Sequence, residues 1–132
     1  MQYFAELEKL LDASSAPYSG FNVSSIVVSK SGEHFNGVNV ESVAYPTTMC
    51  AERTAIFSAI ASGVKRGEIK EVHILARNVE KNFIAAFPCG SCRQVIAEQS
   101  NNKAKVYIYS SQEDILEHTI SELLPYAFFS LD

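Results

Sequence analysis

Apolar residues at helical spacing begin the chain, and two stretches of strand-like sequence follow them. The spacing of three and four predicts an amphipathic helix over about residues 2 to 13. A segment with Pro and Gly at 16–20 breaks this helix. Residues 21–29 and 34–38 are predicted strands, and the Ser-Gly pair between them favours a tight hairpin turn. The apolar positions of the predicted helix are Phe4, Leu7, Leu10 and Leu11.

The middle of the chain continues with a helix and then a strand. Residues 50–62 are predicted to be helical, and Gly63 is placed to end the helix in the left-handed conformation. Thr47 and Thr48 are candidate N-caps for it. Residues 71–76 are strand-like. The apolar side of the helix consists of Ala55, Ile56, Ala59 and Ile60.

The last third of the chain has the same kind of pattern. Pro88 marks the start of a helix that runs to residue 99, and residues 105–110 form another predicted strand. Residues 115–119 are a weaker strand candidate, and Thr119 and Glu122 then have capping-box spacing. Since no repeat or linker interrupts this order, residues 1–132 are predicted to form one α/β domain with helices packed on a sheet.

Composition and charge narrow the class of protein. Apolar residues make up 47% and charged residues 20% of 132 residues, which is typical of a globular domain. No segment approaches the roughly 20 apolar residues of a membrane span and no signal peptide is recognisable, so a cytoplasmic location without membrane binding is expected. The net charge of -4 and the scattered Lys and Arg disfavour a nucleic-acid polymer as substrate.

All three cysteines lie in two short motifs, Cys50-Ala51-Glu52 and Pro88-Cys89-Gly90-Ser91-Cys92. Three protein ligands on a tetrahedral zinc ion leave a fourth position for water, which is typical of catalytic rather than structural zinc sites. The odd cysteine count also suits a reducing compartment better than a disulfide framework. Glu52, beside the first ligand, could then move protons.

The spacing of the motifs indicates how one metal ion could be reached. Cys89 and Cys92 are three apart, so on a helix they share a face. Cys50 and Glu52 can face one site only at a helix start, and two helix starts are therefore predicted to converge on one zinc ion. Arg53 and Arg93 follow the motifs and could donate to ligand sulfur, or could simply be structural or solvated arginines.

With these motifs the sequence resembles the cytidine deaminase family over nearly its whole length. The resemblance implies a three-layer α/β/α domain with a mixed, about five-stranded sheet. It also implies one zinc ion per subunit and usually a homotetramer. The stretches that carry it are Ala16-Pro17-Tyr18-Ser19 with Phe21, Gly37-Val38-Asn39-Val40-Glu41, Cys50-Ala51-Glu52-Arg53-Thr54-Ala55, Pro88-Cys89-Gly90-Ser91-Cys92-Arg93-Gln94-Val95, and Glu122-Leu123-Leu124-Pro125 followed by Phe128.

The implied reaction is hydrolytic deamination of cytidine and deoxycytidine to uridine and deoxyuridine, with release of ammonia, in pyrimidine salvage. Zinc on Cys50, Cys89 and Cys92 would lower the pKa of a water molecule, and Glu52 would take its proton so that hydroxide attacks C4. Glu52 would then return protons to N3 and to the leaving amine.

The resemblance also implies a set of residues around the nucleoside. Asn39 and Glu41 match the family's sugar-binding pair, and the backbone at Ala51 would contact the pyrimidine. Phe21 resembles an aromatic residue that encloses the nucleoside. Phe128 resembles another, contributed by a neighbouring subunit, and Tyr45 resembles a family tyrosine near the subunit contacts.

Four alternatives remain open at this point. The nearest is a deaminase of the same fold that acts on blasticidin S or another modified cytosine compound. The Cys-x-x-Cys pair could instead be redox-active, although redox chemistry does not require a third cysteine with an adjacent Glu. The others are a non-catalytic zinc-binding module and a polynucleotide-editing deaminase. A fourth zinc ligand is not expected among the histidines, which are His34, His73 and His118.

Overall fold

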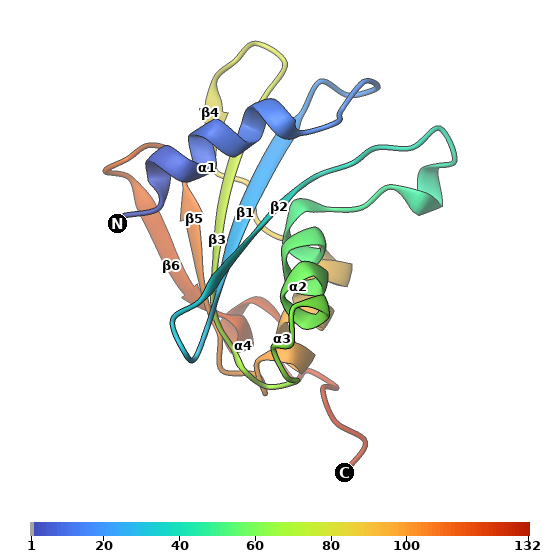
Figure 1. The fold of residues 1–132 in the computed structure, drawn as a ribbon, viewed down its shortest axis with the longest axis vertical. Coiled ribbons are helices and arrows are strands. Elements are labelled where there is room, and N and C mark those ends of the chain that lie inside the picture. The colour runs from blue at the N-terminus through green and yellow to red at the C-terminus, as the bar shows by residue number, and fades with distance from the viewer. Residues whose placement is uncertain (1) are drawn as a thin grey trace.

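The structure is a computed structural model that describes residues 2–132 and centres on one mixed sheet (Figure 1). Its strands are β1 (Asn22–Ser29), β2 (His34–Val38), β3 (Ile69–Arg77), β4 (Phe83–Ile84), β5 (Lys105–Tyr109) and β6 (Ile115–Thr119). Its α-helices are α1 (Phe4–Leu10), α2 (Ala51–Ala61), α3 (Gly90–Gln99) and α4 (Ile120–Leu123). Two short 3-10 helices are η1 (Leu11–Ala13) and η2 (Tyr45–Thr47).

Five strands run across the sheet in the order β2-β1-β3-β5-β6, and β4 pairs with β3 beside this path. The β3–β5 pair is parallel, with α3 in the connection between them, and the other pairs are antiparallel. The mixed sheet of about five strands is therefore confirmed. The additional strand β4 has two residues, too few to give an alternating pattern in the sequence.

Helices cover both faces of the sheet. Helix α1 lies across one face, and α2, α3 and α4 lie on the other, which confirms the three-layer α/β/α arrangement (Figure 1). On the α1 side, Ser24 is a buried polar residue of β1, and its hydroxyl donates to the carbonyl of Leu7 at 2.7 Å. This hydrogen bond fastens α1 to β1.

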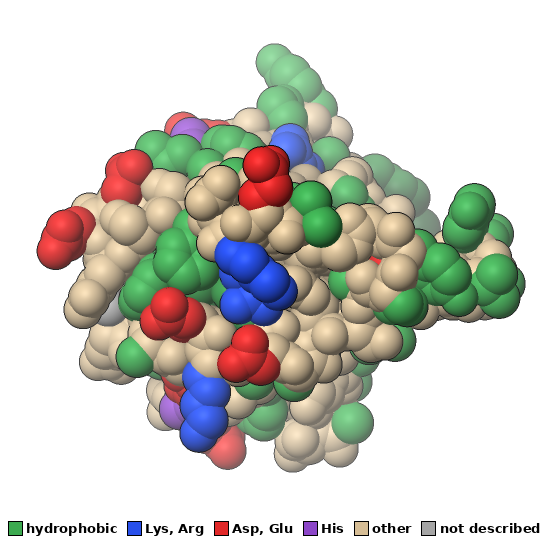
Figure 2. All heavy atoms as spheres, turned by 90° about the horizontal axis from the view of Figure 1, so that it is seen from above, with side chains coloured by type: hydrophobic (Ala, Val, Ile, Leu, Met, Phe, Trp, Pro, Cys, Tyr) green, Lys and Arg blue, Asp and Glu red, His purple; other side chains and the backbone are tan. Residues whose placement is uncertain are grey.

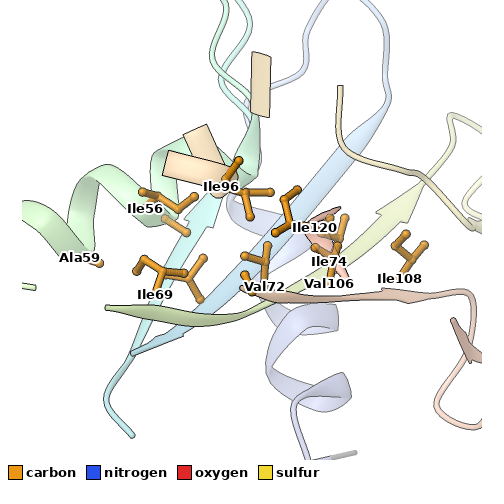
Figure 3. Packing of buried hydrophobic residues seen from close by; sticks show 13 residues of the cluster. Ile56, Ala59, Ile69, Val72, Ile74, Ile96, Val106, Ile108 and Ile120 are labelled. Carbon is orange, nitrogen blue, oxygen red and sulfur yellow. The ribbon is translucent and has the colours of Figure 1, made fainter. Parts of the chain in front are cut away.

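The larger hydrophobic core lies between the sheet and the second helical layer. Ile56 of α2, Ile96 of α3 and Ile120 of α4 point toward one another and toward Val72 of β3 and Val106 of β5 (Figure 3). All are fully buried. Burial of each such side chain contributes about 1.5–3 kcal/mol, so this core fixes α2 and α3 on one face of the sheet.

The helix ends differ from the sequence expectations at two places. Helix α2 begins at Ala51 with Cys50 as its N-cap, so the prediction of Thr47 or Thr48 as N-cap was wrong. The Thr48 hydroxyl instead accepts from the Ser42 N–H at 3.0 Å. Helix α3 likewise has Cys89 as its N-cap, one residue beyond Pro88.

Other end signals are confirmed. Gly63 follows α2 with a φ of 107°, in the left-handed region that favours glycine. The capping box of Thr119 and Glu122 is formed at the start of α4.

Within residues 2–132, none of the helices has the length and apolar character needed to cross a membrane. Basic side chains on the face seen in Figure 2 are interspersed with acidic ones. No basic stripe is visible on that face.

Candidate metal centre and pocket

The three cysteines meet at the N-termini of α2 and α3. Their sulfur atoms all lie within 4.8 Å of one another, and the Sγ atoms of Cys50 and Cys89 are 3.7 Å apart. A tetrahedral zinc ion with Zn–S bonds of about 2.3 Å needs sulfurs about 3.8 Å apart. The donor set and its spacing therefore suit one zinc ion, and the predicted convergence of two helix starts is confirmed.

The start of α2 packs closely against the sheet. Gly37 of β2 faces the first turns of α2, where a Cβ atom would lie 2.4 Å from the carbonyl oxygen of Ala51. On the other side, Cys92 is fully buried while Cys89 is exposed. The cluster is thus anchored in the core on one side and open on the other.

The two arginines that follow the motifs have different roles. The Arg53 guanidinium donates to the Cys50 sulfur at 3.5 Å, as the sequence suggested. Arg93 donates instead to two carbonyl oxygens, of Pro88 and of Leu123, both at 2.7 Å. Its hydrogen bonds thus fix the loop before Cys89 and the end of α4.

The charges around the sulfurs favour a thiolate on one cysteine. The hydrogen bond from Cys92, supported by the Arg53 guanidinium, lowers the pKa of the Cys50 thiol. The same hydrogen bond, together with burial, raises the pKa of Cys92. Thiolate is the form that coordinates zinc, so the contact with Arg53 favours the form of Cys50 that binds the metal.

Glu52 lies beside this cluster in the first turn of α2. Its side chain is among the few buried charged groups, and its carboxyl group borders the pocket described below. Burial raises the pKa of Glu52 to about 7. A carboxyl group with a pKa near neutral pH can both accept and return a proton, which is the property that general acid–base chemistry requires.

A pocket of about 210 Å³ opens next to the cysteines and Glu52. Four of the predicted substrate-binding residues line it: Phe21, Asn39, Glu41 and Ala51. Ala86 and Phe87, from the loop between β4 and α3, also line it and were missed by the sequence reasoning. The only signal was an aromatic residue directly before Pro88. Other lining residues are Val23, Thr48, Met49, Cys50, Glu52, Ile74 and Cys89.

The Asn39 side chain is already engaged within the protein. Its Nδ2 donates to the Phe21 carbonyl at 2.8 Å, and its Oδ1 accepts from the Val23 N–H at 2.9 Å and from the Ser14 hydroxyl. One N–H of the amide stays free for a ligand. Asn39 thus also fixes the backbone on both sides of residue 22.

Glu41 is tied to the Ala16–Gly20 segment. Its carboxylate accepts the backbone N–H groups of Tyr18 and Ser19, at 3.0 and 3.1 Å, and the Ser19 hydroxyl. The Ser19 hydroxyl and N–H groups lower the pKa of Glu41, so it is anionic at neutral pH. Three of its roughly four acceptor sites are occupied.

Phe128 and Tyr45 lie outside this pocket. Tyr45 is in η2, on a segment that projects from the body of the protein and carries exposed hydrophobic side chains (Figures 1 and 2). Phe128 is 69% exposed near the C-terminus, and its carbonyl accepts from Gln94 Nε2 at 2.7 Å. Neither reaches the pocket of its own subunit.

This fold and site define a zinc-binding α/β protein whose metal centre borders a pocket. The sequence profile described as "Cytidine and deoxycytidylate deaminase zinc-binding region" matches residues 1–109. The chain belongs to this deaminase family.

Individual proteins agree with the family match. The chain is 39% identical to a cytidine deaminase of Sporosarcina psychrophila over 97% of this chain and 90% of the relative. It is 42% identical to one of Halalkalibacterium halodurans over 88% of this chain and 83% of the relative. The crystal structure of cytidine deaminase from Burkholderia pseudomallei superposes with a TM-score of 0.84 at 35% identity, over 97% of this chain and 100% of that one. A blasticidin-S deaminase of Bacillus cereus is more distant, at 27% identity over 79% of this chain and 74% of the relative.

Proposed function

We propose that this protein catalyses the hydrolytic deamination of cytidine and deoxycytidine to uridine and deoxyuridine, with release of ammonia. The observation that carries the proposal is the buried Glu52 carboxyl group, which lines one pocket together with Cys50 and Cys89 of the three-cysteine cluster. The relatives from Sporosarcina psychrophila and Halalkalibacterium halodurans are cytidine deaminases, which agrees with this reaction.

Each group around the pocket then has a role. Cys50, Cys89 and Cys92 would hold a zinc ion, which would supply the Lewis acidity that makes a water molecule nucleophilic at neutral pH. Glu52 would accept one proton from water and donate it to N3, and would then carry the proton of the new C4 hydroxyl group to the departing amine, which leaves as ammonia. Arg53 offsets part of the negative charge of the three thiolates through its contact with Cys50.

We propose that the substrate is held by four other residues that line the pocket. We assign Phe21 to the face of the pyrimidine and the backbone of Ala51 to its polar edge. Glu41 and the free N–H of Asn39 are assigned to the ribose hydroxyls. After their hydrogen bonds within the protein, Glu41 still has an acceptor site and Asn39 still has an N–H group for a ligand. Arg93 acts indirectly, by fixing the loop before Cys89.

We propose a homotetramer in which Phe128 of one subunit completes the pocket of another and Tyr45 lies at the contact. Both side chains are exposed in the single chain, at 69% and 78%, and would be covered on assembly. Sedimentation equilibrium tests this, since a stable monomer at micromolar concentration contradicts it. We also propose that residues 1–132 act as one domain in the cytoplasm, where a reducing environment keeps the three free cysteines available for zinc.

The direct test of the reaction uses purified protein with one zinc ion per subunit. Incubation with cytidine is followed by loss of cytosine absorbance and by ammonia release, and chromatography identifies uridine as product. Equal amounts of uridine and ammonia are expected. No conversion at full zinc content contradicts the proposal and favours the second candidate, a deaminase for blasticidin S, which the same assay tests with that substrate.

A further inference from the structure

We propose that Phe87 is a specificity-determining residue that limits which substituents at C5 of the cytosine ring are accepted. The inference rests on the proposed function, because it concerns the substrate of the same pocket. Phe87 stands in the loop between β4 and α3, two positions before the zinc ligand Cys89, and it lines the pocket together with Ala86.

The backbone that carries Phe87 is held in place. A residue before proline is confined to extended conformations, so Pro88 restricts Phe87 itself. The Pro88 carbonyl accepts from Arg93 Nε at 2.7 Å, and the next residue, Cys89, is the N-cap of α3. Phe87 is therefore held close to Cys89, because the backbone between them is restricted by Pro88 and by the hydrogen bond from Arg93.

The Phe87 ring is supported on a second element. It lies against the His118 imidazole of β6, with ring centroids 5.8 Å apart at an interplanar angle of 52°. The ring is nevertheless 44% exposed, so it is not a core residue. A half-exposed aromatic ring that borders a pocket and is backed by a neighbouring strand is placed to contact a ligand.

The chemistry of the ring indicates which substituent this wall meets. The reacting atom C4 is bonded to N3, to C5 and to the amine. Glu52 must reach N3 and the amine to move protons, so the C5 side of the ring lies away from Glu52. The wall formed by Ala86 and Phe87 offers no side-chain hydrogen-bond donor or acceptor. It thus suits the apolar C–H edge at C5, and a methyl group there competes with the Phe87 ring for space.

The test compares cytidine with 5-methylcytidine in the zinc-loaded protein and measures kcat/KM for each. One methyl group in an apolar pocket changes discrimination by about 10-fold or more. Phe87→Ala is expected to raise the ratio of 5-methylcytidine to cytidine by at least about tenfold, mostly through KM, and Phe87→Trp to lower it. Phe57→Ala on α2 is the matched control. Phe57 is also 44% exposed but does not line the pocket, and its loss should leave the ratio unchanged.

An unchanged ratio in zinc-replete Phe87→Ala and Phe87→Trp, with cytidine still turned over, overturns the inference and leaves the proposed function intact. Failure of the unsubstituted protein to deaminate cytidine overturns the proposed function instead. Phe87→Leu keeps an apolar side chain of smaller size, so a smaller shift in the same direction is expected even if the alanine variant fails to fold.

Discussion

Gly37 of β2 lies so close to Ala51 at the start of α2 that a Cβ atom on it would meet the Ala51 carbonyl oxygen at 2.4 Å. The Ala55 nitrogen would be equally close, at 2.4 Å. Both contacts are with backbone, which cannot move without shifting the helix that carries Glu52. The absence of a side chain at Gly37 therefore allows β2 to lie close to the start of α2, which follows Cys50 and carries Glu52.

Gly37→Ala is accordingly expected to reduce both stability and activity. Overpacking of this kind costs about 1–3 kcal/mol in the free energy of unfolding, which urea denaturation measures. Gly90→Ala is the matched control, because a Cβ atom there meets nothing within 4 Å. Equal stability of the two variants would show that α2 moves away from β2 without cost.

Glu52→Gln should abolish turnover while zinc stays bound. The amide is nearly the same size as the carboxyl group but cannot shuttle protons, and general acid–base catalysis contributes about 10²–10⁴-fold. Zinc content by atomic absorption and kcat with cytidine measure the two effects separately. Glu80→Gln, at an exposed position between β3 and β4, is the control. Turnover that persists in the Glu52→Gln variant would refute the proton-transfer role.

Arg53→Gln should lower kcat more than it lowers zinc content. The guanidinium donates to the Cys50 sulfur, and without it the three thiolates weaken the electrophilicity of the metal. A loss of about 10-fold or more in kcat is expected. Arg53→Lys keeps the charge and should restore part of it. If both variants match the unsubstituted protein, the contact with Cys50 has no influence on the reaction.

Glu41→Ala should weaken substrate binding only by removing a contact with a hydroxyl group of the sugar. The loss of kcat/KM is expected to be large for cytidine and much smaller for the analogue that lacks the hydroxyl bound by Glu41. Steady-state kinetics with cytidine, deoxycytidine and 3′-deoxycytidine identify that hydroxyl. A uniform loss with all three substrates would instead assign Glu41 to the fixing of Tyr18 and Ser19, whose N–H groups it accepts.

His73 should make the fold less stable as the pH falls. It is fully buried, with Nδ1 2.8 Å from the Tyr109 hydroxyl and Nε2 2.9 Å from Glu71. Burial lowers the pKa of His73, although Glu71 opposes this. Because the folded-state pKa lies below the unfolded value of about 6.5, the stabilisation is present above that value and is lost as pH falls through the folded pKa.

Urea denaturation between pH 8 and 5.5 measures this effect. The slope for one proton is at most about 1.4 kcal/mol per pH unit, and it should diminish in His73→Gln. If the pH dependence of the free energy of unfolding is the same in His73→Gln as in the unsubstituted protein, His73 is not the group responsible.

Much of the metal centre could be predicted from the sequence because its ligands are of one residue type and lie in short motifs. Helix-end signals at Gly63 and Thr119 were also local, and both are confirmed. The N-caps of α2 and α3 were not predicted, since cysteine gives no capping signal and Thr48 had a partner in Ser42.

The pocket wall was harder to predict. Phe87 lies in a loop without periodicity, and its position depends on the nearby Pro88 and Arg93 and on His118, which is distant in the sequence. The partners of Arg93 were also missed, because backbone carbonyls leave no trace in the side-chain pattern. Tertiary contacts of this kind can be identified only in the folded structure.

Cys50 and Cys89 are separated by 39 positions, and α2, β3 and β4 lie between them. A metal ion that bridges the two sulfurs is therefore a removable cross-link that closes a long loop. Closing such a loop withdraws conformational freedom from the unfolded chain, in the manner of a disulfide. The three sulfurs would thus contribute to stability as well as to catalysis. A subunit that loses its metal would lose a cross-link between two distant parts of the chain together with its Lewis acid.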